Sequence, residues 1–115
     1  MAMQRRDVYD VRFDPVEGPE QAGIRPAIIV SRDAQNGPLG TVTVVPCTTH
    51  RPTTRIFPSR TVIQAPEGGL TVDSVALCEQ VRTLSKSRLS RYRGSLSARS
   101  TAAIDRALRI ALDLL

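Results

Sequence analysis

The chain has 115 residues, of which 41% are hydrophobic, and this composition predicts one folded domain (residues 1–115) rather than a disordered segment. Its formal net charge is +5, and arginine supplies all but one of its 16 basic residues. Because a planar guanidinium matches the geometry of phosphate, this bias suits an anionic partner such as nucleic acid. Two Tyr, two Phe and no Trp disfavour recognition by stacking many bases on aromatic rings.

The two cysteines, Cys47 and Cys78, are too few and too far apart to predict a disulfide framework or a zinc site. Both lie in apolar, strand-like runs, where cysteine usually acts as a small buried hydrophobic residue. A reducing cytoplasmic location is therefore expected. No apolar stretch approaches the roughly 18 residues of a membrane span, and the N-terminus lacks the apolar region of a signal peptide.

The first half of the chain predicts three strands separated by loops. The strands are residues 7–14, 27–31 and 41–47. The first alternates polar and apolar side chains with period two. Residues 15–26 contain three prolines and two glycines, and residues 32–40 contain an Asn-Gly pair, so both stretches predict loops. Pro46 predicts that the third strand ends there or lies at a sheet edge.

The second half predicts two further strands and a C-terminal helix. The strands are residues 61–65 and 73–84. The predicted loops and turns are residues 49–59, 66–69 and 85–89. Ser97 is a typical N-cap for a helix that runs to Leu115.

Apolar residues in this last segment recur at intervals of three and four, which predicts that one face of the helix packs on the sheet. They are Ile104, Ala107, Leu108, Ala111, Leu112 and Leu115. Five or six short strands and one terminal helix, without alternation of strands and helices, indicate a mainly β fold. We therefore expect a small antiparallel barrel or sheet with a helix as its cap.

Most sites of known chemistry are missing from the sequence. His50 is the single histidine, which excludes a two-histidine phosphodiesterase mechanism within one chain and, with two separated cysteines, leaves no set of metal ligands. There is no Gly-rich phosphate loop and no nucleophile elbow. Polar residues instead gather in two loops beside strands: Glu20, Gln21 and Arg25 in the first, Thr48 and Thr49 in the second. On residue type alone, a solvated cation and turn-capping hydroxyls remain open for these positions.

Three short motifs follow one another along the chain: EQxGxRP at 20–26, PxTT at 46–49 and DSVALxEQxRT at 73–83. With this series the chain resembles the MazF/PemK family of toxins from type II toxin–antitoxin systems, which are sequence-specific endoribonucleases. The resemblance covers roughly residues 5–112. One departure is Arg6, where family members commonly have glycine before the aspartate, and we expect it to alter only the entry to the first strand.

The resemblance implies an SH3-like antiparallel barrel of the MazF/CcdB type, a homodimer, and cleavage of single-stranded RNA without a metal ion or cofactor. The arginine of the RP motif and the first threonine of PxTT are the catalytic pair of the family, and they fall here on Arg25 and Thr48. Further positions match those that line the RNA groove: Glu20, Gln21, Asn36, Thr49, Glu79 and Gln80.

The reaction that the resemblance implies is attack of a ribose 2′-hydroxyl on the adjacent phosphate, which leaves a 2′,3′-cyclic phosphate and a 5′-hydroxyl. Arg25 would stabilise charge on the phosphate oxygens, and Thr48 would donate a hydrogen bond to the same group. Because the pKa of arginine lies above about 12, charge stabilisation suits Arg25 better than a role as general base.

The implied partner is a small MazE-like antitoxin whose acidic, partly disordered tail covers the basic groove. Two other functions stay open at this point. A CcdB-like toxin that inhibits DNA gyrase would share the barrel but not the RP and PxTT pair. A non-enzymatic nucleic-acid-binding barrel would bind RNA with strong salt dependence and leave no cleavage products.

Overall fold

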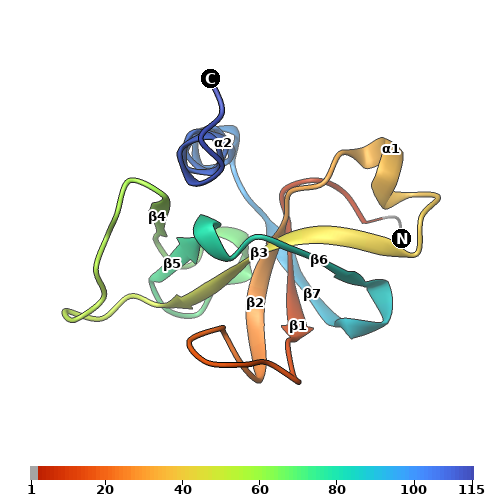
Figure 1. Cartoon of the computed structure of the whole chain (residues 1–115), viewed down its shortest axis with the longest axis horizontal. Helices are drawn as coiled ribbons and strands as arrows, with labels where there is room; N and C mark the ends of the chain where they lie inside the picture. The colour runs from red at the N-terminus through yellow and green to blue at the C-terminus, as the bar shows by residue number, and fades with distance from the viewer. Residues whose placement is uncertain (1–2) are drawn as a thin grey trace.

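The computed structural model describes residues 3–115, and they form a mainly antiparallel β structure with a helix at the C-terminal end (Figure 1), which confirms the predicted fold class. The strands are β1 (Asp7–Arg12), β2 (Ile24–Ile29), β3 (Thr41–Thr49), β4 (Arg60–Ile63), β5 (Ser74–Leu77), β6 (Arg82–Ser85) and β7 (Leu89–Ser95). The helical segments are α1 (Asp33–Asn36), η1 (Glu67–Gly69), η2 (Cys78–Gln80), η3 (Lys86–Arg88) and α2 (Ala98–Ala111).

The strands pair in the order β4-β5-β3-β2-β1-β7, and β6 also pairs with β3. The long strand β3 is the centre of the sheet, because it pairs with β6 at 41–44, with β2 at 44–46 and with β5 at 47–49. The two ends of the order, β4 and β7, are not paired with each other among the described residues. The sheet is therefore not a closed barrel, and the expected barrel is corrected to an open antiparallel sheet.

Pro46 lies inside β3 rather than at its end, in register with Ala27 of β2. The carbonyl of Thr43 accepts hydrogen bonds from the N–H groups of Val30 and Ser31, which directly follow β2. By alternation along the strand, the backbone nitrogen of Pro46 faces the opposite side. On that side Pro46 falls between the stretches paired with β6 and with β5, so its missing N–H breaks no ladder hydrogen bond.

Alternation along β2 and β3 divides the core into two clusters, one on each face of the sheet. Ile28 and Val45 belong to the first cluster, whereas Ala27 and Val44 belong to the second. Helix α2 covers the first cluster with Ile104, which confirms that its apolar face packs on the sheet. The helix ends at Ala111, before the predicted Leu115. Two residues of the predicted apolar face, Leu112 and Leu115, therefore lie outside the helix and are exposed. Within residues 3–115 no helix has the length and apolar character of a membrane span.

Arg6 precedes β1 with a φ of 74°, in the left-handed region that favours glycine. The backbone there is held from two sides, because its N–H donates to the carbonyl of Ile29 at 2.7 Å and its carbonyl accepts from Leu96 at 3.0 Å. Arg6, where members of the resembled family commonly have glycine, thus has a backbone conformation that glycine adopts without strain.

Candidate functional site

Arg25 and Thr48 lie within strands β2 and β3, not in the loops to which their sequence context assigned them. The pairing of Ala27 with Pro46 is the last recorded step of the β2–β3 register. Arg25 and Thr48 lie two residues beyond this pair, each on the same face of its strand as Ala27 and Pro46. Each strand also has a second partner here, since Arg25 is in register with Val11 and Thr48 with Val75.

Arg25 is exposed, and its Nε–H donates a hydrogen bond to the carbonyl of Ala22 at 3.2 Å. Its four remaining N–H donors have no acceptor within residues 3–115, so they can bind an anion. Thr48 is half-buried next to Cys47. Burial, and then the neighbouring Cys78, raise the pKa of the Cys47 thiol to about 12, so Cys47 is protonated at neutral pH and is not a nucleophile.

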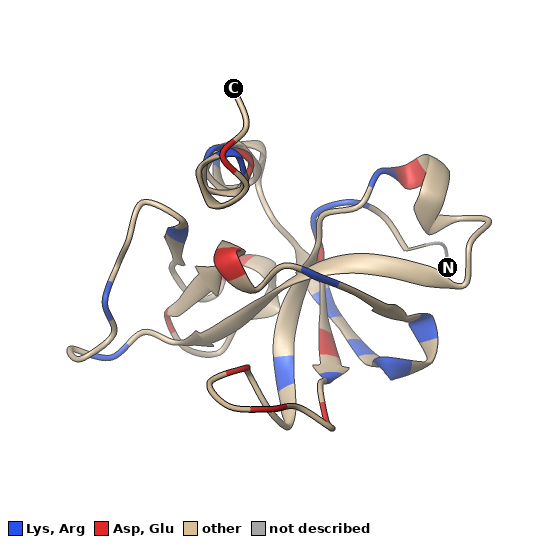
Figure 2. Ribbon diagram, viewed as in Figure 1, with Lys and Arg blue, Asp and Glu red and all other residues tan. Residues whose placement is uncertain are grey.

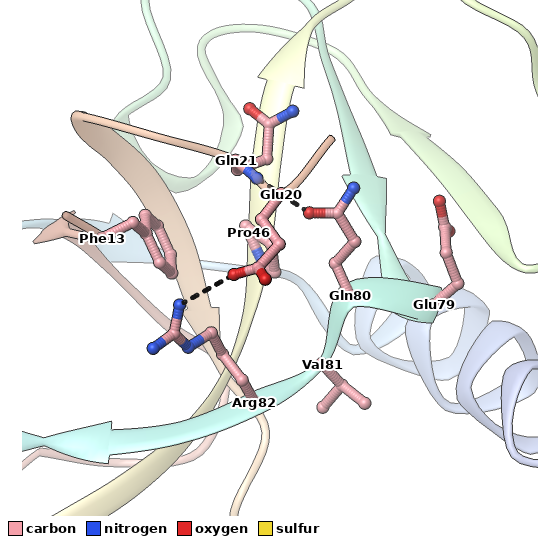
Figure 3. Close-up of a pocket in the computed structure, with 8 residues that line it drawn as sticks. All are labelled: Phe13, Glu20, Gln21, Pro46, Glu79, Gln80, Val81 and Arg82. Atoms are coloured by element: carbon pink, nitrogen blue, oxygen red, sulfur yellow. Dashed lines mark hydrogen bonds and ion pairs between the residues drawn. The ribbon is translucent and has the colours of Figure 1, made fainter. Parts of the chain in front are cut away.

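A cavity of about 290 Å³ lies beside this face, between the β1–β2 loop and η2 (Figure 3). Pro46 lines it from β3, and Phe13, Glu20 and Gln21 line it from the loop. The other lining residues follow β5: Glu79, Gln80, Val81 and Arg82. This cavity thereby brings together four of the residues predicted to contact RNA: Glu20, Gln21, Glu79 and Gln80.

The polar side chains of this cavity are bonded to one another rather than isolated. Gln80 accepts a hydrogen bond at Oε1 from the backbone N–H of Gln21 at 3.0 Å. Nη1 of Arg82 lies 3.9 Å from Oε2 of Glu20, and the guanidinium carbon of Arg82 lies 5.8 Å from the centre of the Phe13 ring. Figure 3 shows these two links crossing the cavity from η2 and β6 to the loop.

Glu79 stands apart from the other side chains in Figure 3, on the far side of Gln80. Its carboxylate accepts hydrogen bonds from Nε and Nη2 of Arg60, at 2.9 and 2.5 Å. The Arg60 guanidinium lies 4.5 Å from the centre of the Phe57 ring, and that of Arg55 lies 5.4 Å from it. Apart from an arginine-rich loop, no sequence pattern indicates this cluster, because Arg60 and Glu79 lie 19 residues apart along the chain.

Asn36, which is predicted to line the RNA groove, is buried in the RNA-free structure. Asn36 ends α1 and is 1% exposed. Its amide donates to the carbonyl of Ser31 at 2.7 Å and to Asp33 at 3.1 Å, and its carbonyl accepts from the Ser31 hydroxyl. In the Asn-Gly pair that predicted a turn, Gly37 lies in a turn after α1, and the buried Asn36 side chain holds the loop between β2 and β3 in place through its hydrogen bonds.

Thr49 and Thr48 line a second cavity, of about 300 Å³, together with Ile24, Pro26 and Arg93. Arg25 lines neither of the two cavities. Of the catalytic pair predicted from the motifs, Thr48 thus lines the second cavity with Thr49, whereas the acidic and amide residues line the first. No three His, Cys, Asp or Glu side chains come together as possible metal ligands in the part of the chain that the structure describes.

The two long loops near the site differ in the sign of their charge. The β1–β2 loop, residues 13–23, carries three acidic residues and no basic one, whereas the β3–β4 loop, residues 50–59, carries two arginines and no acidic residue. Figure 2 shows this contrast between the red segments of the first loop and the blue segments of the second. A polyanion is therefore attracted to the β3–β4 loop and repelled from the acidic carboxylates of the β1–β2 loop.

Known proteins resemble the chain along almost its whole length. It is 37% identical over 117 aligned positions to Endoribonuclease MazF9 of Mycobacterium tuberculosis, covering 97% of this chain and 98% of the relative. It is 38% identical to Endoribonuclease MazF of Staphylococcus saprophyticus, covering 97% and 92%. A solved structure, an endoribonuclease in complex with its cognate antitoxin from Mycobacterial species, superposes with a TM-score of 0.81 at 28% identity, over 99% of this chain and 98% of the other.

The model of a toxin family agrees with these relatives. It matches residues 4–112 and describes a PemK-like, MazF-like toxin of a type II toxin-antitoxin system. Neither a gyrase-inhibiting toxin nor a non-enzymatic barrel is favoured by relatives that are named as endoribonucleases. The chain belongs to the PemK-like and MazF-like family of type II toxin–antitoxin toxins.

Proposed function

We propose that the chain is a toxin that cleaves single-stranded RNA at specific sequences, without a metal ion, and leaves 2′,3′-cyclic phosphate and 5′-hydroxyl ends. Membership of the family and the names of its relatives support an endoribonuclease. The observation that carries the finer proposal is the placement of Arg25 and Thr48 on adjacent strands, two residues beyond the paired Ala27 and Pro46.

This placement suits transfer within a phosphodiester, which needs alignment of the 2′-hydroxyl and stabilisation of charge on the phosphate. Arg25 offers forked donors to the phosphate oxygens, and the Thr48 hydroxyl offers one more. Both sit on paired strands, so their positions are held by backbone hydrogen bonds rather than by loop conformation. The carboxylate of Glu20, beside a cavity, suits hydrogen bonds from exocyclic amino groups of bases.

The test is cleavage by purified variants. We expect Arg25→Ala and Thr48→Ala each to lower kcat/KM for a single-stranded RNA by about 100-fold or more, the usual effect of removing one transition-state donor. The melting temperature should stay within a few degrees of wild type. Arg109→Ala, which removes an exposed cation from α2, is the matched control and should cleave at the wild-type rate.

The same assay tests the remaining features of the proposal. Cleavage should persist in excess EDTA, DNA of the same sequence should stay intact, and mapping of 5′-hydroxyl ends should give one short motif. Wild-type rates in Arg25→Ala would contradict the assigned mechanism. Salt-sensitive binding without new 5′-hydroxyl ends would indicate a non-enzymatic nucleic-acid-binding protein instead.

We also infer a cytoplasmic homodimer that an acidic antitoxin segment inhibits. A structural relative is named as being in complex with its cognate antitoxin, and the net charge of +5 favours an acidic segment here. An acidic peptide from the neighbouring gene product should compete with RNA, and light scattering should give twice the monomer mass.

A further inference from the structure

The three-residue segment η2 contacts two loops that carry residues of the proposed RNA site. Its first residue, Cys78, is fully buried in the core, and its N–H donates to the carbonyl of Ser59 at 3.2 Å. Its other two side chains bond to different parts of the chain: the half-buried Gln80 accepts from the Gln21 N–H of the β1–β2 loop, and the exposed Glu79 accepts from Arg60, the first residue of β4. A segment fixed in the core is thus linked to one loop directly and to the other through Arg60.

Arg60 connects Glu79 to the β3–β4 loop. Its Nη1 donates to the carbonyl of Arg55 at 2.9 Å, its guanidinium lies over Phe57, and Nε and Nη2 both donate to Glu79. The Arg60 side chain is 18% exposed, against 33% for Glu79. All three nitrogens of Arg60 are therefore bonded within the protein, which makes Arg60 a poor phosphate contact and a good anchor for the loop.

The β3–β4 loop is tied at its two ends, by His50 N–H to the Asp73 carbonyl at 2.8 Å and by Cys78 N–H to the Ser59 carbonyl, and its middle has few other contacts. Among the described residues, hydrogen bonds from 51–58 reach no further along the chain than 49–60, such as Thr54 N–H to the Arg51 carbonyl at 2.9 Å. Arg60 connects these local hydrogen bonds to η2, because it donates both to the Arg55 carbonyl and to Glu79. Between these two tied ends, the Arg60–Glu79 ion pair is the side-chain link that holds the middle of the loop, with Arg51 and Arg55, to η2.

The β1–β2 loop is closed at its base by Phe13 N–H to the Gly23 carbonyl at 2.9 Å and by Gly23 N–H to Asp14 at 3.1 Å. Gln80 is bonded to the side of the loop that faces the cavity, next to Glu20. Loss of the Gln80 oxygen would free the segment that carries two of the residues predicted to line the RNA groove, Glu20 and Gln21.

We propose that η2 is a brace that positions both loops, with Gln80 holding the β1–β2 loop and Glu79 holding the β3–β4 loop through Arg60. Glu79 and Gln80 are then positioning residues and not RNA contacts. The consequence for RNA rests on the proposed function. The brace itself is a property of the RNA-free protein and is tested there.

Amide hydrogen exchange of the full-length, RNA-free chain tests the brace. Glu79→Ala should speed exchange about three- to tenfold at Arg51 and Thr54, a change of the size that such an ion pair supports, and leave Glu20 and Gly23 at wild-type rates. Gln80→Leu should speed exchange at Glu20 and Gly23 and leave Arg51 and Thr54 at wild-type rates. Gln21 is left out of the comparison because its own N–H loses an acceptor.

Matched variants separate the brace from general loss of structure. Gln80→Glu keeps an acceptor oxygen and should keep wild-type exchange. Arg60→Met also removes the bond to the Arg55 carbonyl and should speed exchange at Arg51 and Thr54 at least as much as Glu79→Ala does. The double variant of Arg60→Met and Glu79→Ala should show no more than the effect of Arg60→Met alone, since that substitution already removes the link to Glu79. Unchanged loop exchange, or a rise that spreads equally to both loops and to β3, would overturn the proposal.

Cleavage kinetics give the functional readout. Because Arg25 and Thr48 lie on strands, loosening a loop should raise KM severalfold and change kcat less, for both Glu79→Ala and Gln80→Leu. If these two residues contacted RNA directly, KM would rise while the RNA-free exchange pattern stayed that of wild type, which contradicts the brace. Absence of cleavage by the wild-type chain would refute the proposed function and leave the exchange result standing.

Discussion

At the scale of single residues, Arg6 shows a conflict between a side chain and its backbone. A non-glycine residue with φ of 74° costs about 1–2 kcal/mol, whereas glycine restores roughly 0.5–1 kcal/mol of entropy to the unfolded chain. Arg6→Gly should therefore stabilise the protein by about 0.5–1 kcal/mol, or about 2–4 °C in melting temperature for a chain of this size.

Calorimetry or chemical denaturation measures this change, and Arg6→Ala is its control. Alanine removes the charge and the long side chain but keeps the strain of the left-handed conformation. Arg6→Ala should therefore leave stability near that of wild type. An equal gain in both variants would place the cost in the arginine side chain and contradict the account based on the backbone.

The catalytic pair shows what residue patterns can and cannot predict. Arg25 and Thr48 stand out through the RP and PxTT motifs, but local composition places both in loops. They lie in strands because partners distant in sequence extend β2 and β3: Val11 opposite Arg25, and Val75 opposite Thr48. The burial of Asn36 escaped prediction for a related reason, since it depends on contacts with Ser31 that no short motif encodes.

At the scale of elements, the predictions hold where apolar residues alternate and fail where tertiary contacts decide. Strand β7 escaped prediction because Leu89–Ser95 has few apolar side chains and pairs with β1 through its backbone. The predicted strand at 73–84 is broken by η2, because β5 and β6 pair with different stretches of the same strand, β3. No glycine or proline marks that break, so the sequence carries no local signal for it.

The turn η1 depends on glycine for close packing against β7. Gly69 has a φ of 69°, and a Cβ at this position would lie 2.1 Å from the Arg93 carbonyl oxygen. The backbone of β7 has little room to move away, because a Cβ at Gly94 would itself lie 3.0 Å from the Gly68 backbone. Gly69→Ala should therefore lower the free energy of unfolding by about 3 kcal/mol or more, from overpacking and strain together.

Denaturant unfolding checks this prediction, with Gly37→Ala as the matched control. Gly37 has a φ of −74°, and a Cβ there meets only the Asp33 carbonyl at 3.8 Å. That substitution should be neutral or stabilise by up to about 1 kcal/mol. A loss below 1 kcal/mol in Gly69→Ala would show that η1 moves away from β7 without cost, against the packing described here.

At the scale of the whole molecule, charge should set how binding depends on salt. Single-stranded RNA releases about 0.7 counterions per neutralised phosphate. If Arg25, Arg51 and Arg55 each contact one phosphate, the logarithm of the association constant should fall with a slope of about −2 against the logarithm of salt concentration. A rise from 50 to 200 mM salt should then raise Kd about 18-fold for an oligonucleotide with a 2′-deoxy sugar at the cut site, which prevents cleavage.

Two variants that remove one positive charge each distinguish local contacts from net charge. Arg51→Gln, in the β3–β4 loop, should lower the salt-induced increase in Kd to about 7-fold, because one phosphate contact is lost. Arg109→Gln, on the exposed part of α2, should keep the 18-fold increase although the net charge falls by the same amount. Equal slopes for the two variants would mean that RNA responds to the overall charge of +5 and not to a path along the β3–β4 loop. Fluorescence anisotropy at four salt concentrations resolves a slope difference of this size.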